Sequence, residues 1–523
     1  MNGSQAMVRT LLAGNIDVCF ANPGTSEMHF VAALDQATEM RCILGLFEGV
    51  VTGAADGYYR MKGQPAATLL HLGPGLGNGL ANLHNARKAH SGIVNIIGQH
   101  ALDHIHNDAP LNSDVEAVAR PMSHWVKTTR SATLAPMDTA EAISQARSSP
   151  GRIASLILPA NCAWEAADPG HYSSDPARPP AAPLAESIEA MAKQLSDKAR
   201  AAKTVLLLGG GAMMANCTWL GGQIAAKTGC QIMAEPRTGR LERGLGRVNV
   251  HALPFAVDEA VKTLKGTKDL ILVGASAPVG FFAYPDKPRL MAPPDCLVHT
   301  LATPGHDLLA TLEALCEAVG AKQTPPAQLS QTAMSGGFED GTPNSANIGR
   351  VLVGALPEHA IWVDEAITSG RQLADSIPYA PAHDCIDITG GAIGFGLPAA
   401  VGAAIAAPDR RVVALVGDGS AMYTIQALWT MAREQLNVTT VIFDNRSYRI
   451  LRGELSNMGG PKPGVNAARM LDLDQPDLDW ISLAKGHGVP AVAVNTLSGF
   501  DEALRRANAT PGPSLIALRM ETE

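Results

Sequence analysis

Short apolar runs alternate with longer amphipathic stretches along most of the chain. The runs are rich in Val, Ile, Leu and Ala, and many end in glycine or in a polar residue. Each run predicts a buried strand and each longer stretch a helix, so the alternation predicts parallel sheets covered by helices. The predicted strands lie in DVCFANPG, AATLLHLGPG, SGIVNIIGQH, IASLILPA, TVLLLGGGA, CQIMAE, DLILVGAS, AIWVDEA, VVALVGDGS, TTVIFDN and SLIALRM.

Two stretches rich in Pro, Ser and Ala interrupt this alternation, at residues 172–187 and 322–343. Such composition is typical of linkers. They divide the chain into three predicted α/β domains, residues 1–171, 188–321 and 344–523, each built on an open parallel sheet. A length of 523 residues, at about 150 residues per domain, also predicts about three domains.

Composition and charge narrow the possible partners. Hydrophobic residues make up 46% of the chain, and the net charge of -8 is spread without a basic block, which argues against nucleic acid and anionic membranes as partners. No secretory leader and no apolar span of about 18 residues is found. The 8 cysteines include no CxxC pair, which is typical of free thiols in a reducing compartment, and we expect a cytoplasmic protein.

Polar side chains follow two of the predicted strands near the C-terminus. Asp418 comes directly after VVALVG, and Asn445 follows 27 residues later, after TTVIFD. One strand–helix–strand crossover has this length, so both side chains are expected at the same sheet edge. Carboxylate, amide and carbonyl oxygens suit Mg²⁺, and a glycine-flanked helix start suits a diphosphate. The alternative is a tight turn in which Asp418 only caps the following helix.

This Gly-Asp-Gly turn with a later asparagine resembles the diphosphate motif of the thiamine diphosphate-dependent 2-oxo acid decarboxylases and acetohydroxyacid synthases. The resemblance implies that Asp418, Asn445 and the carbonyl of Ser447 hold Mg²⁺. It also implies that Gly419 and Ser420 contact the diphosphate of bound thiamine diphosphate. The family's paired asparagines are here Asp-Asn, and only the second is a ligand in the family.

The stretch FEGVVTGAADGYYR (47–60) resembles the family segment that carries the cofactor-activating glutamate, here Glu48. A carboxyl group at the aminopyrimidine nitrogen helps to remove the proton from the reactive carbon of the cofactor. Without the family, Glu48 would be a glutamate at a helix N-terminus, favoured there by the helix dipole. In the family this acid reaches the cofactor of the opposite subunit, which implies a homodimer or homotetramer with active sites between subunits.

The glycine-rich stretch DITGGAIGFG (387–396) is similar to the family's turn beneath the thiamine rings. The similarity implies that the Gly391 carbonyl accepts the aminopyrimidine amine and that Ile393 is the apolar wedge that bends the cofactor. Thr368 is a further candidate for a diphosphate contact. From the residues alone, the stretch is only a glycine-rich loop before a buried helix.

Two motifs in the first third resemble those of the benzoylformate decarboxylases, Asn22–Glu27 (NPGTSE) and Leu70–Asn78 (LHLGPGLGN). The resemblance implies that Thr25 contacts the substrate carboxylate and that His71 relays protons, which an imidazole can do near neutral pH. A hydrogen-bonded structural histidine is the alternative. Acetohydroxyacid synthases share the following Gly-Pro-Gly but carry a small hydroxyl residue at the position of His71, so the sequence mixes both patterns.

Departures from the family restrict the substrate. The aromatic residues that flank a phenyl substrate fall at Asp387 and Glu454, and the second catalytic histidine has no counterpart near GFFAYPD (280–286). These differences argue against benzoylformate itself. His104 and His106 lie on a predicted loop where related decarboxylases place histidines, and they stay candidates.

The resemblance implies a lyase or transferase that decarboxylates a small-molecule 2-oxo acid to an enamine, which is then protonated to an aldehyde. The alternative is acetolactate synthase-like carboligation onto a second carbonyl compound. The turn in LLLGGGAMMAN (206–216) lacks GxGxxG, so we expect neither FAD nor a nicotinamide oxidoreductase. A catalytically silent homologue is disfavoured by the retention of Glu48, Asp418 and Asn445.

Overall fold

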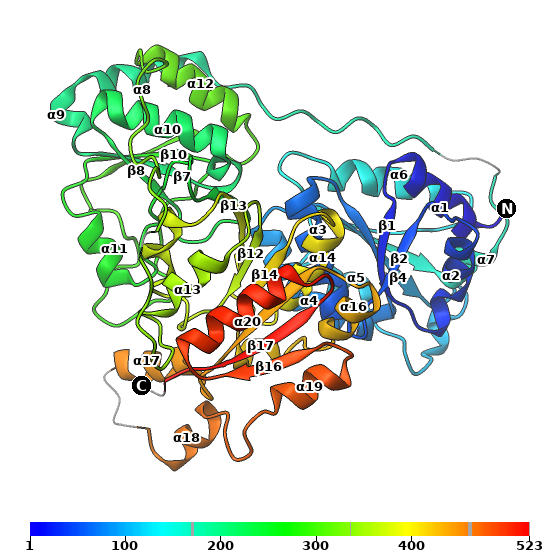
Figure 1. The fold of residues 1–523 in the computed structure, drawn as a ribbon. Helices are drawn as coiled ribbons and strands as arrows, with labels where there is room; N and C mark the ends of the chain where they lie inside the picture. The colour runs from blue at the N-terminus through cyan, green and yellow to red at the C-terminus, as the bar shows by residue number, and fades with distance from the viewer. Residues whose placement is uncertain (169–171, 335, 459–462, 522–523) are drawn as a thin grey trace.

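The computed structural model describes all residues except 169–171, 335, 459–462 and 522–523. Its described strands form three separate sheets, dominated by parallel pairing and flanked by helices, which confirms the predicted α/β class (Figure 1). The linker that begins at Tyr172 runs without helix or strand to α8. The second linker, 322–343, likewise holds no helix or strand among its described residues.

The first sheet is parallel throughout, in the order β2-β1-β3-β4-β6-β5. Its strands are β1 Val18–Asn22, β2 Arg41–Leu44, β3 Ala66–Leu70, β4 Ile93–Gln99, β5 Trp125–Thr128 and β6 Ile153–Pro159. The helices are α1 Gly3–Ala13, η1 Thr25–Glu27, α2 Met28–Asp35, α3 Glu48–Lys62, α4 Leu72–Lys88, η2 Ile105–Asn107, α5 Val115–Ala119, α6 Ala135–Ala146 and α7 Ala160–Trp164.

The second sheet, also parallel, has the order β11-β10-β7-β8. Its strands are β7 Thr204–Leu208, β8 Gln231–Ala234, β10 Asp269–Val273 and β11 Leu297–Ala302. The helices are α8 Ala185–Ser196, α9 Lys198–Ala201, η3 Gly210–Met213, α10 Ala215–Thr228, α11 Val257–Thr263 and α12 Leu308–Ala318.

The third sheet has the order β16-β17-β15-β14-β12-β13-β9. Its strands are β9 Leu241–Arg243, β12 Ile361–Glu365, β13 His383–Asp387, β14 Val412–Gly417, β15 Val438–Asp444, β16 Ala491–Val494 and β17 Ser514–Arg519. The helices are α13 Ile348–Ala355, η4 Leu373–Asp375, η5 Ile377–Tyr379, α14 Gly396–Ala406, α15 Asp418–Ala421, α16 Ala427–Arg433, α17 Arg449–Asn457, α18 Val465–Leu471, α19 Trp480–Gly486 and α20 Leu497–Ala509.

Several strands were not predicted, and most of them lie at the edge of a sheet or carry polar residues. β5, β11 and β16 are sheet-edge strands that are partly exposed. β9 has only three residues, comes from the middle of the chain and pairs antiparallel with β13, so the third sheet is not wholly parallel. β13 is buried although it carries charges, because Asp384 pairs with Arg240 at 2.8 Å and also with Arg410.

Helices α3 and α14 meet backbone to backbone and join the first sheet to the third (Figure 1). A Cβ atom on Gly402 would overlap the carbonyl oxygen of Ala54, and one on Gly57 would overlap that of Ala399. Glycine therefore permits an approach that any side chain would prevent. Every described residue of α14 up to Ile405 is buried, as expected for a helix enclosed on all sides.

Arg60 connects all three parts of the chain. Its guanidinium binds Asp56 in a two-pronged ion pair with N–O distances of 2.8 and 2.6 Å. It also donates to the carbonyls of Asp387 at 2.7 Å and Gly239 at 3.2 Å. Its side chain is only 2% exposed, and a buried charge of this kind is tolerated because all of its bonds are made.

Two further findings concern the whole described chain. None of its helices is both long and apolar enough to cross a membrane. All 8 cysteines are free thiols.

The contact between α3 and α14 generates a stability prediction. Gly402→Ala should lower the free energy of unfolding by about 1–3 kcal/mol, because the added methyl group forces the two backbones apart. The control is Gly354→Ala in α13, where the nearest atom to the added Cβ is 3.7 Å away, and which should be neutral or stabilising. Denaturant unfolding followed by circular dichroism compares the two variants. Equal free energies of unfolding for Gly402→Ala and Gly354→Ala would contradict the close packing of α3 and α14.

Candidate active site

Asp418 and Asn445 lie at one edge of the third sheet. Their strands β14 and β15 are parallel neighbours, with Gly417 opposite Phe443. The Asp418 carboxylate accepts the N–H of Arg446 at 2.6 Å, and the Asn445 side-chain oxygen accepts that of Ser447 at 2.9 Å. The two side chains therefore share one turn, as their spacing predicts.

The chemistry of this turn fits a magnesium ion. Asp418 is 2% exposed, and its carboxylate is hydrogen-bonded by the backbone amides of Gly419 and Arg446. Burial raises the pKa of Asp418 to about 6, so a neighbouring cation would stabilise the charged form. With Asn445 and the Ser447 carbonyl it would offer three hard oxygen ligands. The described ranges hold no cluster of three His, Cys, Asp or Glu side chains that could bind a metal, so the amide and carbonyl oxygens of this turn would be needed.

The predicted diphosphate contacts surround the same turn. Gly419 lies under the ring of Tyr448, which a Cβ atom at this position would overlap, and Ser420 is buried in α15. Thr368 is also buried, beside Ser369, whose hydroxyl accepts a hydrogen bond from Asn445 at 3.4 Å. The ends of β12, β14 and β15 thus bring these predicted residues to one sheet edge.

The loop that carries Gly391 and Ile393 is held by two asparagines of α4. The side chain of Asn85 exchanges two hydrogen bonds with the backbone of Ala392, at 2.8 and 3.2 Å. Asn82 donates to the carbonyls of Gly394 at 3.0 Å and Gly49 at 2.8 Å. The loop is therefore joined, within one chain, to the residue that follows Glu48. Both asparagines were missed by sequence reasoning, although polar residues on the buried face of an apolar helix are a detectable signal.

Glu48 is the first residue of α3 and is 6% exposed. Its carboxylate accepts a hydrogen bond from Asn78 at 3.0 Å. A Cβ atom on Gly75 would lie 3.0 Å from the Glu48 carboxylate and 3.2 Å from the Cβ of His71. Gly75 thus lies beside both predicted catalytic side chains, which the carboxyl ends of β2 and β3 bring together.

His71 is the residue between β3 and α4, and a buried glutamate holds its ring. Nδ1 lies 2.8 Å from the Glu27 carboxylate, which also accepts the N–H of Gly24 at 2.8 Å. Glu27 is 3% exposed, and Ser26 lies 3.3 Å from the same ring nitrogen. Thr25 is exposed in the same turn. The role of Glu27 was missed, since only the fold brings η1 against the end of β3.

The positions where a phenyl substrate would need aromatic residues are polar and paired. Asp387 binds Arg237 at 2.7 Å, and Glu454 accepts a hydrogen bond from the Tyr284 hydroxyl at 2.9 Å. Phe281 of the 280–286 segment lies against Gly391. Phe281, Tyr284 and Glu454 line a cavity of about 730 Å³ beside the predicted cofactor loop.

His104 and His106 lie on an exposed loop at η2. His104 is 3.1 Å from the Asn107 amide, and its ring lies 5.8 Å from that of His100. Neither histidine makes a described hydrogen bond or ion pair with His71 or Glu48.

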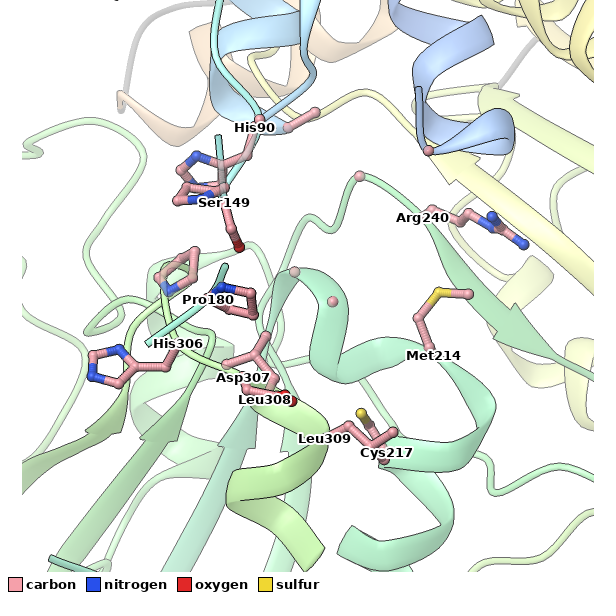
Figure 2. A pocket seen from close by; sticks show the side chains of 18 of the residues that line it. His90, Ser149, Pro180, Met214, Cys217, Arg240, His306, Asp307, Leu308 and Leu309 are labelled. Carbon is pink, nitrogen blue, oxygen red and sulfur yellow. The ribbon is translucent and has the colours of Figure 1, made fainter. Parts of the chain in front are cut away.

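A second cavity, of about 530 Å³, opens beside the glycine-rich turn after β7 (Figure 2). His90, Arg240, His306 and the Met214 thioether lie around it. The N–H of Gly210, in that turn, donates to Glu235 at 2.9 Å, and burial raises the pKa of Glu235 to about 7. A phosphate group of FAD could accept the Gly210 N–H only by displacing the Glu235 carboxylate.

The three helix-flanked sheets, the buried Asp–Asn turn and the buried glutamate near a histidine agree with the resemblance to thiamine diphosphate-dependent enzymes. The comparisons name the family. Residues 1–119 match the N-terminal TPP binding domain of thiamine pyrophosphate enzymes, and residues 369–518 match their C-terminal TPP binding domain. The chain belongs to the thiamine pyrophosphate enzyme family, which confirms the resemblance stated from its motifs.

The names of its relatives cover both of the expected activities. IlvX of Mycobacterium tuberculosis, named provisionally as an acetolactate synthase large subunit, is 48% identical over 99% of this chain and 98% of its own. Benzoylformate decarboxylase of Pseudomonas aeruginosa is 31% identical over 96% of each chain. The solved 4-hydroxybenzoylformate decarboxylase of Rhodococcus jostii superposes with a TM-score of 0.85 at 27% identity, over the full length of both chains. The chain is therefore a thiamine diphosphate-dependent enzyme of the decarboxylase and carboligase group.

Proposed function

We propose that this enzyme, with Mg²⁺ and thiamine diphosphate, decarboxylates a 2-oxo acid and releases an aldehyde. The observation that carries the proposal is the Glu27–His71 pair, 2.8 Å apart and one glycine away from Glu48. An oriented imidazole beside the activating acid is what protonation of the product carbon requires. The relationship to two decarboxylases supports the same reading.

The cofactor would be held at the third sheet. Asp418, Asn445 and the Ser447 carbonyl would bind Mg²⁺, and Gly419, Ser420 and Thr368 would contact the diphosphate. Above them, the Gly391 carbonyl and the Ile393 side chain would fix the orientation of the rings. When bound, thiamine diphosphate supplies the carbon nucleophile and the electron sink that make loss of carbon dioxide possible.

The chain's own acids and bases move the protons. The Glu48 carboxyl would hold a proton at the aminopyrimidine ring and so promote removal of the proton from the reactive carbon. Glu27 orients His71 through Nδ1, which leaves Nε2, free of described hydrogen bonds, to give a proton to the product. Thr25 would contact the substrate carboxylate.

The polar pairs Asp387–Arg237 and Glu454–Tyr284 support a substrate other than benzoylformate. A phenyl ring beside Glu454 and Asp387 would meet charged groups in place of aromatic partners and would shield them from water, which is unfavourable. We therefore propose an aliphatic or polar side chain on the 2-oxo acid.

The second candidate is carboligation onto another carbonyl compound. Its support is the 48% identity to IlvX. We also infer a cytoplasmic homodimer or homotetramer, because the family's activating acid serves the opposite subunit and all 8 cysteines are free.

The test is to strip the cofactor, restore thiamine diphosphate and Mg²⁺, and follow carbon dioxide release from aliphatic, aromatic and acidic 2-oxo acids. We expect release that depends on both additions, with aldehyde as the product. An acetolactate-type product in place of aldehyde would establish the carboligase. Absence of both release and carboligation would overturn the proposed function.

Glu48→Gln should retain cofactor binding but lower the rate of proton exchange at the reactive cofactor carbon by at least about a hundredfold, because the amide cannot supply the acid. Exchange is measured by NMR after quenching in deuterated buffer. The control is Glu186→Gln, at the exposed start of α8, because Glu186 is a glutamate whose expected role is only to stabilise a helix N-terminus. Unchanged exchange in the Glu48 variant would refute its role.

Glu27→Gln should lower kcat by about tenfold to a hundredfold with little change in the thermal midpoint, because His71 loses its orienting carboxylate. The double variant Glu27→Gln/His71→Ala should lose little more of kcat than His71→Ala alone, since the two residues act as one unit. Glu39→Gln, at an exposed position, is the matched control. Independent, additive effects on kcat would contradict a shared role.

A further inference from the structure

Beneath the predicted cofactor loop lies a buried carboxylate that no motif assigns. Glu365 is the last residue of β12 and is 1% exposed. It accepts three backbone N–H groups, from Gly394 at 2.8 Å, Phe395 at 3.1 Å and Gly396 at 2.7 Å. One side chain from a neighbouring strand thus satisfies consecutive amides at the start of α14.

This arrangement goes beyond capping a helix. A cap is normally supplied by a residue next to the helix, whereas Glu365 lies about 30 residues earlier in the chain. Two of its three amides belong to residues that precede α14 and follow Ile393. The carboxylate therefore fixes the end of the loop as well as the first turn of the helix.

The other face of the loop is anchored as well. Asn85 binds both backbone groups of Ala392, and the Gly394 carbonyl accepts hydrogen bonds from Asn82 and Thr424, each at 3.0 Å. Gly391 and Gly394 adopt φ values of +75° and +92°, which favour glycine. Hydrogen bonds within the chain thereby hold the loop backbone from both sides.

The fit around Glu365 is specific for a carboxylate. Oε1 accepts two N–H groups and Oε2 accepts the third. A glutamine has one acceptor oxygen, and its amide group would face a backbone N–H, so at least one buried donor would lose its partner. A Cβ atom on Gly396 would lie 3.0 Å from Oε2, which leaves little space for rearrangement.

We propose that Glu365 is a positioning residue for the cofactor, holding the loop so that the Gly391 carbonyl and the Ile393 side chain are preset for the aminopyrimidine and thiazolium rings. The inference rests on the roles proposed above for Gly391 and Ile393. Preorganisation of this kind increases affinity because the ordering is complete before binding.

Glu365→Gln should raise the dissociation constant of thiamine diphosphate, measured with Mg²⁺ by equilibrium dialysis, by at least about tenfold. Binding of inorganic pyrophosphate with Mg²⁺ should change less than about twofold, because it uses only the Asp418 end of the site. A general folding defect would weaken both ligands, so this split separates positioning from a merely structural role. The control is Asp364→Asn, a neighbour that accepts the N–H of Ala366 at 3.0 Å but does not touch the loop.

The outcomes are distinct. Equal thiamine diphosphate affinity in the variant and the wild type, or equal weakening of both ligands, overturns the inference and leaves the proposed function standing. Failure of the wild type to bind thiamine diphosphate overturns both. If Glu365→Gln does not fold, hydrogen exchange of the wild type without cofactor decides: slow exchange at Gly394–Gly396 supports the anchor, and fast exchange contradicts it.

Discussion

The backbone contact between α3 and α14 is the constraint on which the site depends. Both helices begin at the carboxyl ends of their sheets, where parallel α/β proteins bind ligands. Gly57 and Gly402 let the helices approach without intervening side chains. As a result, the start of α3, with Glu48, and the loop before α14 are close enough for Asn82 to bind the carbonyls of Gly49 and Gly394.

Buried charges then give the site its fixed geometry. Glu27, Glu365 and Asp418 are each no more than 3% exposed, and each accepts at least one backbone N–H group. Removing a carboxylate from water is unfavourable, but amides that are already oriented offset part of that cost. The same fixed dipoles are what a catalytic site needs, because they do not have to reorganise during the reaction.

The sequence predicted the parts of this arrangement that follow from local rules. Asp418 and Asn445 could be placed together because one crossover separates them and parallel strands end at one edge. Glu27, Glu365 and Asn85 could not be assigned a role, because each acts on a segment that only the tertiary fold brings near. β13 was missed for a related reason: its two aspartates argue against a buried strand until Arg237, Arg240 and Arg410 are seen to pair with them.

The choice between aldehyde release and carboligation depends on residues other than those that bind the cofactor. The predicted cofactor residues, Glu48 and Asp418 among them, would serve a decarboxylase and a carboligase alike, so they do not distinguish protonation from addition to a second carbonyl compound. The distinction must come from the proton donor and from the space beside it. In the proposed function the donor is His71, which Glu27 holds. Phe281 and the Tyr284–Glu454 hydrogen bond lie at a cavity beside the predicted cofactor loop. A held imidazole would compete directly with a second substrate for the reactive carbon, and this competition would favour release of the aldehyde.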